Sequence, residues 1–316
     1  MRVKREAEHN RWQLHGLNTG TIFGLTCWGV SHLPRAVSCG LGATATWLAY
    51  HLMTEATAGL VENFRVVFPE RSDTELRALA LKTYRHYAKD TIEFIRALRM
   101  RPEQLAIRVH DTAAFDRVIR EGNGALLVAG HVGNWELGGV LLRSVYDYRL
   151  AVVGLPETNA DVNRMRRELR ASLGIESIEV RQAADTALRI RRLLAQNYVV
   201  AMLADRPLGR DRVEVEFFGR RTSFLQAPAL MGYLTGAPLL PSFIMRQPDG
   251  FYSAYTAPPI RVSRTGNRDA AVQAAMQAFA TALENEVRKY PHLWYHFYPY
   301  WGEEQEAASI AAAEQG

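Results

Sequence analysis

The sequence predicts an α/β fold, a layered sheet flanked by helices, with a membrane-associated helical segment at its N-terminus. From about residue 100 onward, short apolar runs of strand length alternate with amphipathic stretches of helical length, which is typical of a sheet covered on both faces. Residues 12–54, by contrast, contain one formally charged residue, Arg35. The composition is that of a globular chain, because 48% of the 316 residues are hydrophobic and 22% are charged.

The apolar N-terminal stretch divides at Pro34 into two runs, 12–33 and 36–54, and each run has close to the roughly 20 residues that span a bilayer. Glycines and histidines dilute the first run, and glycines and threonines dilute the second. Three arrangements therefore stay open: one spanning helix, a shallow hairpin in one leaflet, or a pair of buried helices. The basic residues within 1–11 favour a cytoplasmic position for that end of the chain.

The remaining elements follow from hydrophobic periodicity and from local stop signals. Helical spacing covers residues 60–98, where Ser72 and Glu75 have the spacing of a capping box, and Pro102 lies beyond the end of this region. The expected strands are 125–129, 150–154, 175–180, 198–203, 213–218, 239–244 and 251–256. The expected helices are 134–143, 159–173, 183–196, 226–235 and 269–289.

Charge and cysteine content exclude several classes of protein. The formal net charge is +5, and residues 161–221 hold 13 arginines against nine acidic residues. Aromatic residues do not interleave with a basic strip, so we expect no nucleic-acid partner. With Cys27 and Cys39 as the two cysteines, a disulfide framework is excluded. His292 and His296 lie among prolines without a carboxylate in the same stretch, so we predict neither a metal site nor a cofactor.

The most informative segment is ALLVAGHVGNWELGG, residues 125–139. A buried-type strand ends at Ala129 and a helix begins near Asn134, so His131 falls in the turn at the carboxyl edge of the sheet, where α/β proteins place ligands. With Glu136 in the first helical turn, the two side chains can meet. A carboxylate that accepts one ring N–H leaves the other nitrogen as a base. The residues alone also allow a structural role, in which Glu136 complements the helix N-terminus and His131 caps the turn.

The candidate base has no protein nucleophile to activate in this part of the chain. No cysteine lies nearby, and no serine lies in a Gly-x-Ser-x-Gly elbow. We therefore expect the histidine to deprotonate a substrate hydroxyl, which would then attack an activated acyl group.

Residues 131–136, HVGNWE, resemble the H-x₄-D/E block of the glycerolipid-type acyltransferases. The H-x-x-N-W-E form is similar to that of the lauroyl/myristoyl branch, which completes lipid A in Gram-negative envelopes. The resemblance extends over about residues 60–300. Further blocks follow in the same order: Ala204-Asp205-Arg206 in place of a strand-end Asp-Gln pair, Phe217-Phe218-Gly219, and Thr235-Gly236-Ala237-Pro238-Leu239-Leu240-Pro241. The resemblance implies a glycerolipid acyltransferase-like fold and acyltransferase activity.

By position, the resemblance implies that His131 is the general base and that Glu136 is its orienting acid. The residues expected to bind substrate are Asn134, Arg170, Asp205, Arg164 and Arg167. Arg170 would stabilise the developing oxyanion or a phosphate, and Asp205 would line the pocket or support that arginine. The alternative role for Asp205 is a salt bridge with a neighbouring arginine. The alternative for Arg164 and Arg167 is a solvated helix face.

The resulting hypothesis is a membrane-associated O-acyltransferase. It would move a fatty acyl chain from an acyl carrier protein or coenzyme A thioester to a hydroxyl of lipid A or a related envelope glycolipid or phospholipid. The arginine-rich window would dock the acidic carrier or lipid phosphates. Two departures, Arg206 in place of glutamine and the tyrosine-rich end at 294–301, keep other acceptors open, such as ornithine-type or aryl-polyene-type lipids. A non-catalytic membrane adaptor and a thioester or phospholipid hydrolase remain as alternatives.

This hypothesis also sets the expected organisation and location of the chain. We expect a membrane-associated segment over 1–55, a catalytic domain over 56–302 and a flexible tail over 303–316. The membrane would be the cell inner membrane, with the catalytic domain on the cytoplasmic side, where the thioesters are made.

Overall fold

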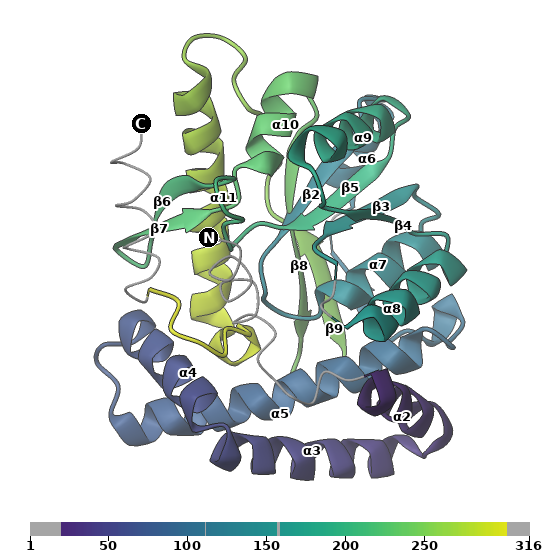
Figure 1. The fold of residues 1–316 in the computed structure, drawn as a ribbon, viewed down its shortest axis with the longest axis vertical. Coiled ribbons are helices and arrows are strands. Elements are labelled where there is room, and N and C mark those ends of the chain that lie inside the picture. Colours follow the sequence, from purple (N-terminus) through teal and green to yellow (C-terminus); the bar gives the residue numbers. More distant parts are fainter. Residues whose placement is uncertain (1–19, 111, 157–158, 302–316) are drawn as a thin grey trace.

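The computed structural model describes residues 20–301 apart from 111, 157 and 158. It confirms the α/β prediction, since a mixed sheet is flanked by helices and stands on a layer of N-terminal helices (Figure 1). The expected tail over 303–316 and the basic flank over 1–11 lie outside the described residues.

Helices from the N-terminal part of the chain form the layer beneath the sheet. These helices are α2 (Gly20–His32), α3 (Arg35–Leu52), α4 (Thr54–Val67) and α5 (Asp73–Ala97). The others pack against α5, which crosses under the sheet (Figure 1). The region predicted as helical over 60–98 is two helices, because Pro69 and the cap at Ser72 interrupt it. The predicted capping box is confirmed: the Ser72 hydroxyl accepts from the Glu75 N–H, and the Glu75 carboxylate accepts from the Ser72 N–H at 2.9 Å.

The N-terminal layer carries many exposed apolar side chains. Within residues 20–301, none of the helices combines the length and the apolar character needed to cross a membrane. Large exposed apolar side chains nevertheless gather on α2 and α3; they are Leu25, Trp28, Val37, Leu41, Trp47, Leu48 and Leu52.

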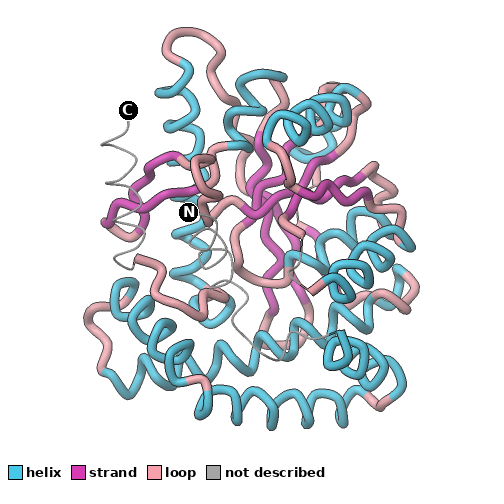
Figure 2. Tube along the Cα trace, viewed as in Figure 1, coloured by secondary structure: helices cyan, strands magenta, loops and turns pink. Residues whose placement is uncertain are grey.

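The main sheet has the strand order β1-β9-β8-β2-β5-β3-β4 and is parallel except for the β8–β9 pair (Figure 2). Its strands are β1 (Ile107–Val109), β2 (Ala125–Ala129), β3 (Leu150–Gly154), β4 (Glu176–Glu179), β5 (Val199–Leu203), β8 (Leu239–Arg246) and β9 (Tyr252–Thr256). A separate antiparallel hairpin consists of β6 (Val213–Phe217) and β7 (Arg220–Phe224). Neighbouring parallel strands end at one edge, so side chains that follow β2 and β5 are brought together there.

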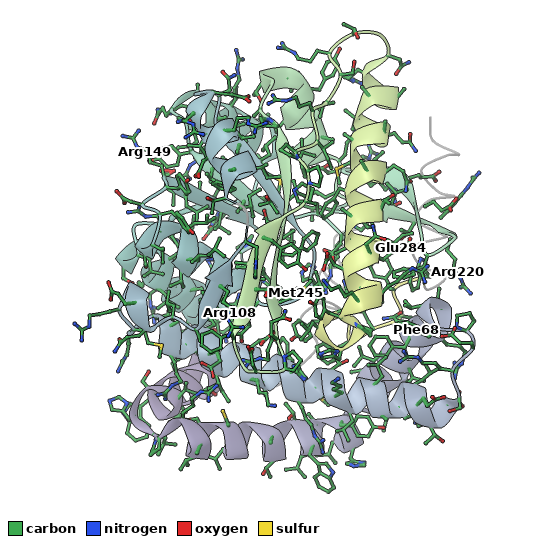
Figure 3. The ribbon with its side chains drawn as sticks, turned by 180° about the vertical axis from the view of Figure 1, so that it is seen from behind. Phe68, Arg108, Arg149, Arg220, Met245 and Glu284 are labelled. Atoms are coloured by element: carbon green, nitrogen blue, oxygen red, sulfur yellow. The ribbon has the colours of Figure 1, made fainter. Side chains whose placement is uncertain are left out.

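The two faces of the sheet are covered differently. The remaining helices are α6 (Ala113–Arg120), α7 (Trp135–Ser144), α8 (Ala160–Ser172), α9 (Ala183–Ala195), α10 (Ala227–Thr235) and α11 (Arg268–Lys289). The largest core lies between the sheet and α9, α10 and α11 and continues into α4 and α5, and Met245 of β8 is buried in it (Figure 3). Arg108, Arg149 and Arg220 project at the periphery in the same view. On the other face, α7 packs over β3 and β8.

The sequence located most elements but missed several short ones. Each predicted strand and each predicted helix after residue 100 lies within two residues of its observed bounds. The strands and α-helices that were not predicted are β1, β7 and α6; two 3₁₀ helices, Pro102–Gln104 and Pro291–Leu293, were not predicted either. β1 has three residues with a charged residue in the middle and β7 begins with two arginines, so neither gives a clear apolar period. α6 is amphipathic but has only eight residues, which is shorter than the window that identifies a helix.

Candidate active site

His131 lies in the turn between β2 and α7, and backbone hydrogen bonds fix this turn. The N–H of Gly133 donates to the Leu293 carbonyl at 2.9 Å, and the N–H of Asn134 donates to the Ile244 carbonyl at 2.9 Å. Gly133 has a φ of +66°, and a Cβ at this position would lie 2.2 Å from the Ile244 carbonyl oxygen. Only glycine permits that approach, so the turn that carries His131 is held from two sides of the fold.

The carboxylate that contacts the His131 ring is that of Asp205. β2 and β5 are parallel neighbours with Ala129 opposite Leu203, so the residues that follow the two strands meet. His131 Nδ1 lies 2.7 Å from Asp205 Oδ1, and the His131 main-chain N–H donates to Oδ2 at 2.7 Å. Since an ionised carboxylate only accepts, Nδ1 carries the proton and Nε2 is the basic nitrogen.

A second histidine, His296, contacts the same carboxylate. Its Nε2 donates to Asp205 Oδ2 at 2.9 Å, and the Tyr298 hydroxyl donates to its Nδ1 at 2.7 Å. His296 and Asp205 are both 0% exposed. The C-terminal segment, residues 290–301, also contacts the turn directly, because the Tyr295 N–H donates to the His131 carbonyl at 2.8 Å.

Burial and neighbouring charges set the protonation of this group. Burial would raise the pKa of Asp205, but the two imidazoles hold that pKa well below its ordinary value. Burial lowers the pKa of His131, and the Arg206 guanidinium lowers it further, while Asp205 opposes both. Burial is the main cause that lowers the pKa of His296 to about 3. At neutral pH the group is therefore an ionised carboxylate between two neutral imidazoles, and His131 is in its base form.

The expected pairing of His131 with Glu136 is wrong, because the ring nitrogen that was assigned to Glu136 is bonded to Asp205. Glu136 lies in the first turn of α7, which faces α8. Its Oε1 accepts from Arg170 Nη2 at 3.1 Å and lies 3.5 Å from Arg166 Nη1. Glu136 and His131 nevertheless line the same cavity.

The structure places Asn134, whose substrate-binding role stays a prediction, at the start of α7. Asn134 is 5% exposed and lies outside the cavity lining. Its Oδ1 accepts from the Leu137 N–H at 3.2 Å, which caps α7, and its Nδ2 donates to the Asp90 carbonyl at 2.9 Å. Asn134 therefore ties the start of α7 to α5.

The predicted arginines of α8 take different positions. Arg170 and Arg167 line the cavity, and Arg167 Nη1 lies 3.5 Å from Glu179 Oε1. Arg164 lies outside the lining and pairs in solvent with Asp161 at 2.8 Å, so the solvated-face alternative describes it. The contacts observed for the Asp205 carboxylate are with His131 and His296, which differs from the two arginine roles expected of it.

A cavity of about 1920 Å³ opens beside His131. Most small-molecule sites have ~300–1,000 Å³, so this cavity has room for more than one ligand group. Its apolar arm runs between α7 and the sheet and is lined by Leu127, Ala129, Leu142, Leu150, Val152 and Ala201. The arm follows β3 from Leu150 to Gly154, a path of roughly 13 Å at the usual rise per strand residue. The basic residues of the lining are Arg166, Arg167, Arg170, Arg206, Arg210 and Arg212.

Comparison with known proteins agrees with this architecture. The family model of the bacterial lipid A biosynthesis acyltransferases matches residues 9–303. The chain belongs to this family. The resemblance inferred from the sequence blocks is thereby confirmed.

Two curated proteins that the chain resembles are named phosphatidylinositol mannoside acyltransferase. The protein of Mycolicibacterium smegmatis is 30% identical over 181 residues, which are 57% of each chain. The protein of Mycobacterium tuberculosis is 28% identical over 187 residues, which are 59% of this chain and 57% of the relative. The chain thus spans little more than half the length of these relatives.

The histidine–carboxylate group also resembles a metal-ligand set by distance. Among the described residues, the potential ligand atoms of His131, Asp205 and His296 all lie within 4.8 Å of one another. Both Asp205 oxygens accept hydrogen bonds from these imidazoles, however. A metal ion would have to replace those bonds, so the donor set fits proton transfer better than metal binding.

Sequence reasoning missed the contribution of the C-terminal segment. His296 was considered only as a metal ligand, and Tyr298 was not singled out. The available signal was the aromatic run at 294–301, because such a run is more often buried than exposed.

Proposed function

We propose that the protein is a membrane-associated O-acyltransferase that moves a fatty acyl chain from a thioester to a hydroxyl group of a lipid. The observation that carries this proposal is the setting of His131. Its Nδ1 is bonded to the buried Asp205 carboxylate, and its ring lines a cavity with an apolar arm. A base beside a space for an alkyl chain is what acyl transfer to an alcohol requires.

In the proposed reaction, His131 Nε2 takes the proton of the acceptor hydroxyl while the oxygen attacks the thioester carbonyl carbon. The C–S bond then breaks, and the imidazolium returns its proton to the departing thiolate. Asp205 stabilises the imidazolium and keeps the ring in the productive tautomer. A base in this role typically contributes about 10²–10⁴-fold in rate.

The acyl donor would approach from the basic part of the cavity. Arg166 and Arg167 of α8, with Arg210 and Arg212 after β5, line this part. Guanidinium groups suit the phosphates of coenzyme A and of the carrier-protein prosthetic group. Transfer from the carrier protein should weaken more steeply with salt, because an acidic protein is steered over a longer range.

The acceptor we propose is an envelope glycolipid or phospholipid. Membership of the lipid A family supports a saccharide-bearing lipid, and so do the names of the mycobacterial relatives. Lipid A precursors and mannosylated phosphatidylinositol are the first acceptors to assay. Ornithine-type and aryl-polyene-type lipids are the next.

We propose that the exposed apolar side chains of α2 and α3 bind the surface of the inner membrane from the cytoplasmic side. Leu25, Trp28, Leu41 and Leu52 are between 59% and 77% exposed. An apolar surface of this kind is typical of a membrane or protein contact. Trp28→Glu with Leu52→Glu should reduce co-sedimentation with anionic phospholipid vesicles; unchanged binding would contradict this placement.

The assay that tests the proposal uses the purified chain, acyl carrier protein and coenzyme A thioesters, and the acceptors above, with products measured by mass spectrometry. His131→Ala should lower kcat by about 10²–10⁴-fold. Arg220→Gln is the matched control, because Arg220 is exposed on the β6–β7 hairpin. Near-normal turnover by folded His131→Ala protein would contradict the mechanism.

The same assay separates the alternatives. A hydrolase would release free fatty acid at the same rate with and without the lipid acceptor. An adaptor would show no turnover with any donor. The position of His131 in the cavity lining argues against the adaptor.

A further inference from the structure

Arg206 is the basic residue that lies closest in the chain to the catalytic group. It directly follows Asp205 at the end of β5, is half-buried and lines the cavity together with His131. The acyltransferase branch that the sequence resembles has a glutamine at this position, whereas this chain has an arginine.

The C-terminal segment holds the Arg206 guanidinium in place. Its Nη2 donates to the Tyr295 carbonyl at 3.3 Å, and its Cζ lies 5.0 Å from the centre of the Tyr298 ring. The N–H of Tyr295 donates to the His131 carbonyl at 2.8 Å. The base and the guanidinium are therefore both held by one short stretch of chain.

The α8 arginines are held by a different carboxylate. Arg170 and Arg166 approach Glu136 at 3.1 and 3.5 Å, on the α7–α8 side of the cavity.

We propose that Arg206 binds the oxyanion that forms on the thioester carbonyl during acyl transfer. This inference rests on the proposed function. As the acceptor oxygen bonds to the carbonyl carbon and His131 Nε2 takes its proton, the carbonyl π electrons move onto the oxygen beside Arg206. When the C=O bond re-forms, the C–S bond breaks and the thiolate receives the proton from the imidazolium. Charge stabilisation of this kind is strongest in a site shielded from water.

Arg206 has a second, measurable effect, because its charge acts on the base. The groups that act on the His131 ring are Asp205 and Arg206 after β5 and His296 from the C-terminal segment, while Glu136 of α7 and the α8 arginines line the same cavity. Arg206 lowers the pKa of His131. Removing its charge raises that pKa. The decline of kcat/KM at acid pH, called the acid limb below, therefore moves to higher pH.

The test compares Arg206→Gln and Arg206→Lys with the Arg220→Gln control in the purified full chain. Arg206→Gln should lower kcat by about 10²–10³-fold with a small change in the KM for the thioester. Its acid limb should also move to higher pH. Arg206→Lys keeps the charge, so it should recover part of the lost kcat and leave the acid limb where the wild-type protein has it. Unchanged thermal midpoints verify the fold.

Three results would overturn the inference. The first is a kcat for Arg206→Gln within about threefold of wild type. The second is a loss confined to the KM for the lipid acceptor, which would assign Arg206 to an acceptor phosphate. The third is an unchanged acid limb. Full activity of His131→Ala in the same assay would instead contradict the proposed function itself, so the two failures are distinguishable.

Discussion

Asp90 and Asp205 are buried carboxylates, at 4% and 0% exposure, and the C-terminal segment contacts both. Asp90 of α5 accepts from Arg246 Nε at 3.0 Å and from the hydroxyls of Tyr252 at 2.7 Å and Tyr295 at 2.6 Å. Asp205 accepts from two imidazoles instead. Both groups are fully engaged in hydrogen bonds, so burial alone does not tell them apart.

The difference lies in their partners and in access to the cavity. Neither Asp90 nor Arg246, Tyr252 and Tyr295 lines the cavity, whereas His131 does. Burial raises the pKa of Asp90, with Arg246 and the hydroxyls opposing it, whereas the imidazoles hold the pKa of Asp205 low. The Asp90 cluster lies outside the cavity and links α5 to the sheet. A carboxylate whose imidazole partner reaches a cavity can support proton transfer.

Asp205→Asn is expected to have the largest effect, and that effect is on catalysis. The amide keeps the shape of the side chain but does not hold the His131 Nδ1 proton as a carboxylate does, so kcat should fall by about 10³–10⁴-fold. Single-turnover acyl transfer measures it. A folded Asp205→Asn protein with wild-type turnover would remove the distinction between the two carboxylates.

Asp90→Ala should mainly affect stability. It leaves Arg246, which is 7% exposed, without its buried anion, so the free energy of unfolding should fall by about 3–5 kcal/mol. The control is Asp249→Ala, which removes an exposed pair with Arg108 at 2.5 Å and should cost about 1 kcal/mol or less. Chemical denaturation measures both. Equal losses in the free energy of unfolding for the two variants would show that the Asp90 cluster does not stabilise the packing of α5 against the sheet.

Gly139→Leu fills the cavity and leaves both carboxylates in place. A Cβ at Gly139 would lie 3.5 Å from Ile175 and 3.8 Å from Leu150, so the backbone tolerates a side chain that projects towards the apolar arm. Transfer of long acyl chains should fall relative to short ones by roughly fourfold per excluded methylene, at about 0.8 kcal/mol each. Competition between thioesters of different length measures this ratio. An unchanged ratio would place the acyl chain elsewhere.

The pH dependence of activity should show the smallest effect. Because burial and Arg206 lower the pKa of His131 from its ordinary value of 6.5, the neutral base persists as the pH falls through 6.5. The kcat/KM of the wild-type protein should therefore stay level there and decline at lower pH. An acid limb centred at or above 6.5 would contradict the assigned protonation state.

The sequence predicted the local features of the site and missed the contacts that depend on strand order. The run ALLVA and the glycines after it placed His131 in the strand-to-helix turn, as observed. The partner of its ring could not be predicted, because Asp205 meets it only through the pairing of β2 with β5, and β3 and β4 lie between them in sequence. Glu136 was closer in the chain and was chosen for that reason, although α7 turns it towards α8.

The sequence analysis also missed the contribution of the C-terminal segment. His296 lies 91 residues beyond Asp205, and its ring reaches the carboxylate because Asn63 of α4 holds the segment. Asn63 Nδ2 donates to the carbonyls of His296 at 3.1 Å and Tyr298 at 2.8 Å. No local periodicity encodes contacts between such distant segments.

The claim that Asp205 orients the base is tested most directly by ¹⁵N NMR of the imidazoles, with the His131 signals assigned by their loss in His131→Ala. In the wild-type protein near neutral pH, His131 should be protonated at Nδ1 and unprotonated at Nε2. In Glu136→Gln this tautomer should remain the main one. In Asp205→Asn it should no longer be the main one. The opposite pattern, a tautomer that survives Asp205→Asn and is lost in Glu136→Gln, would contradict the account.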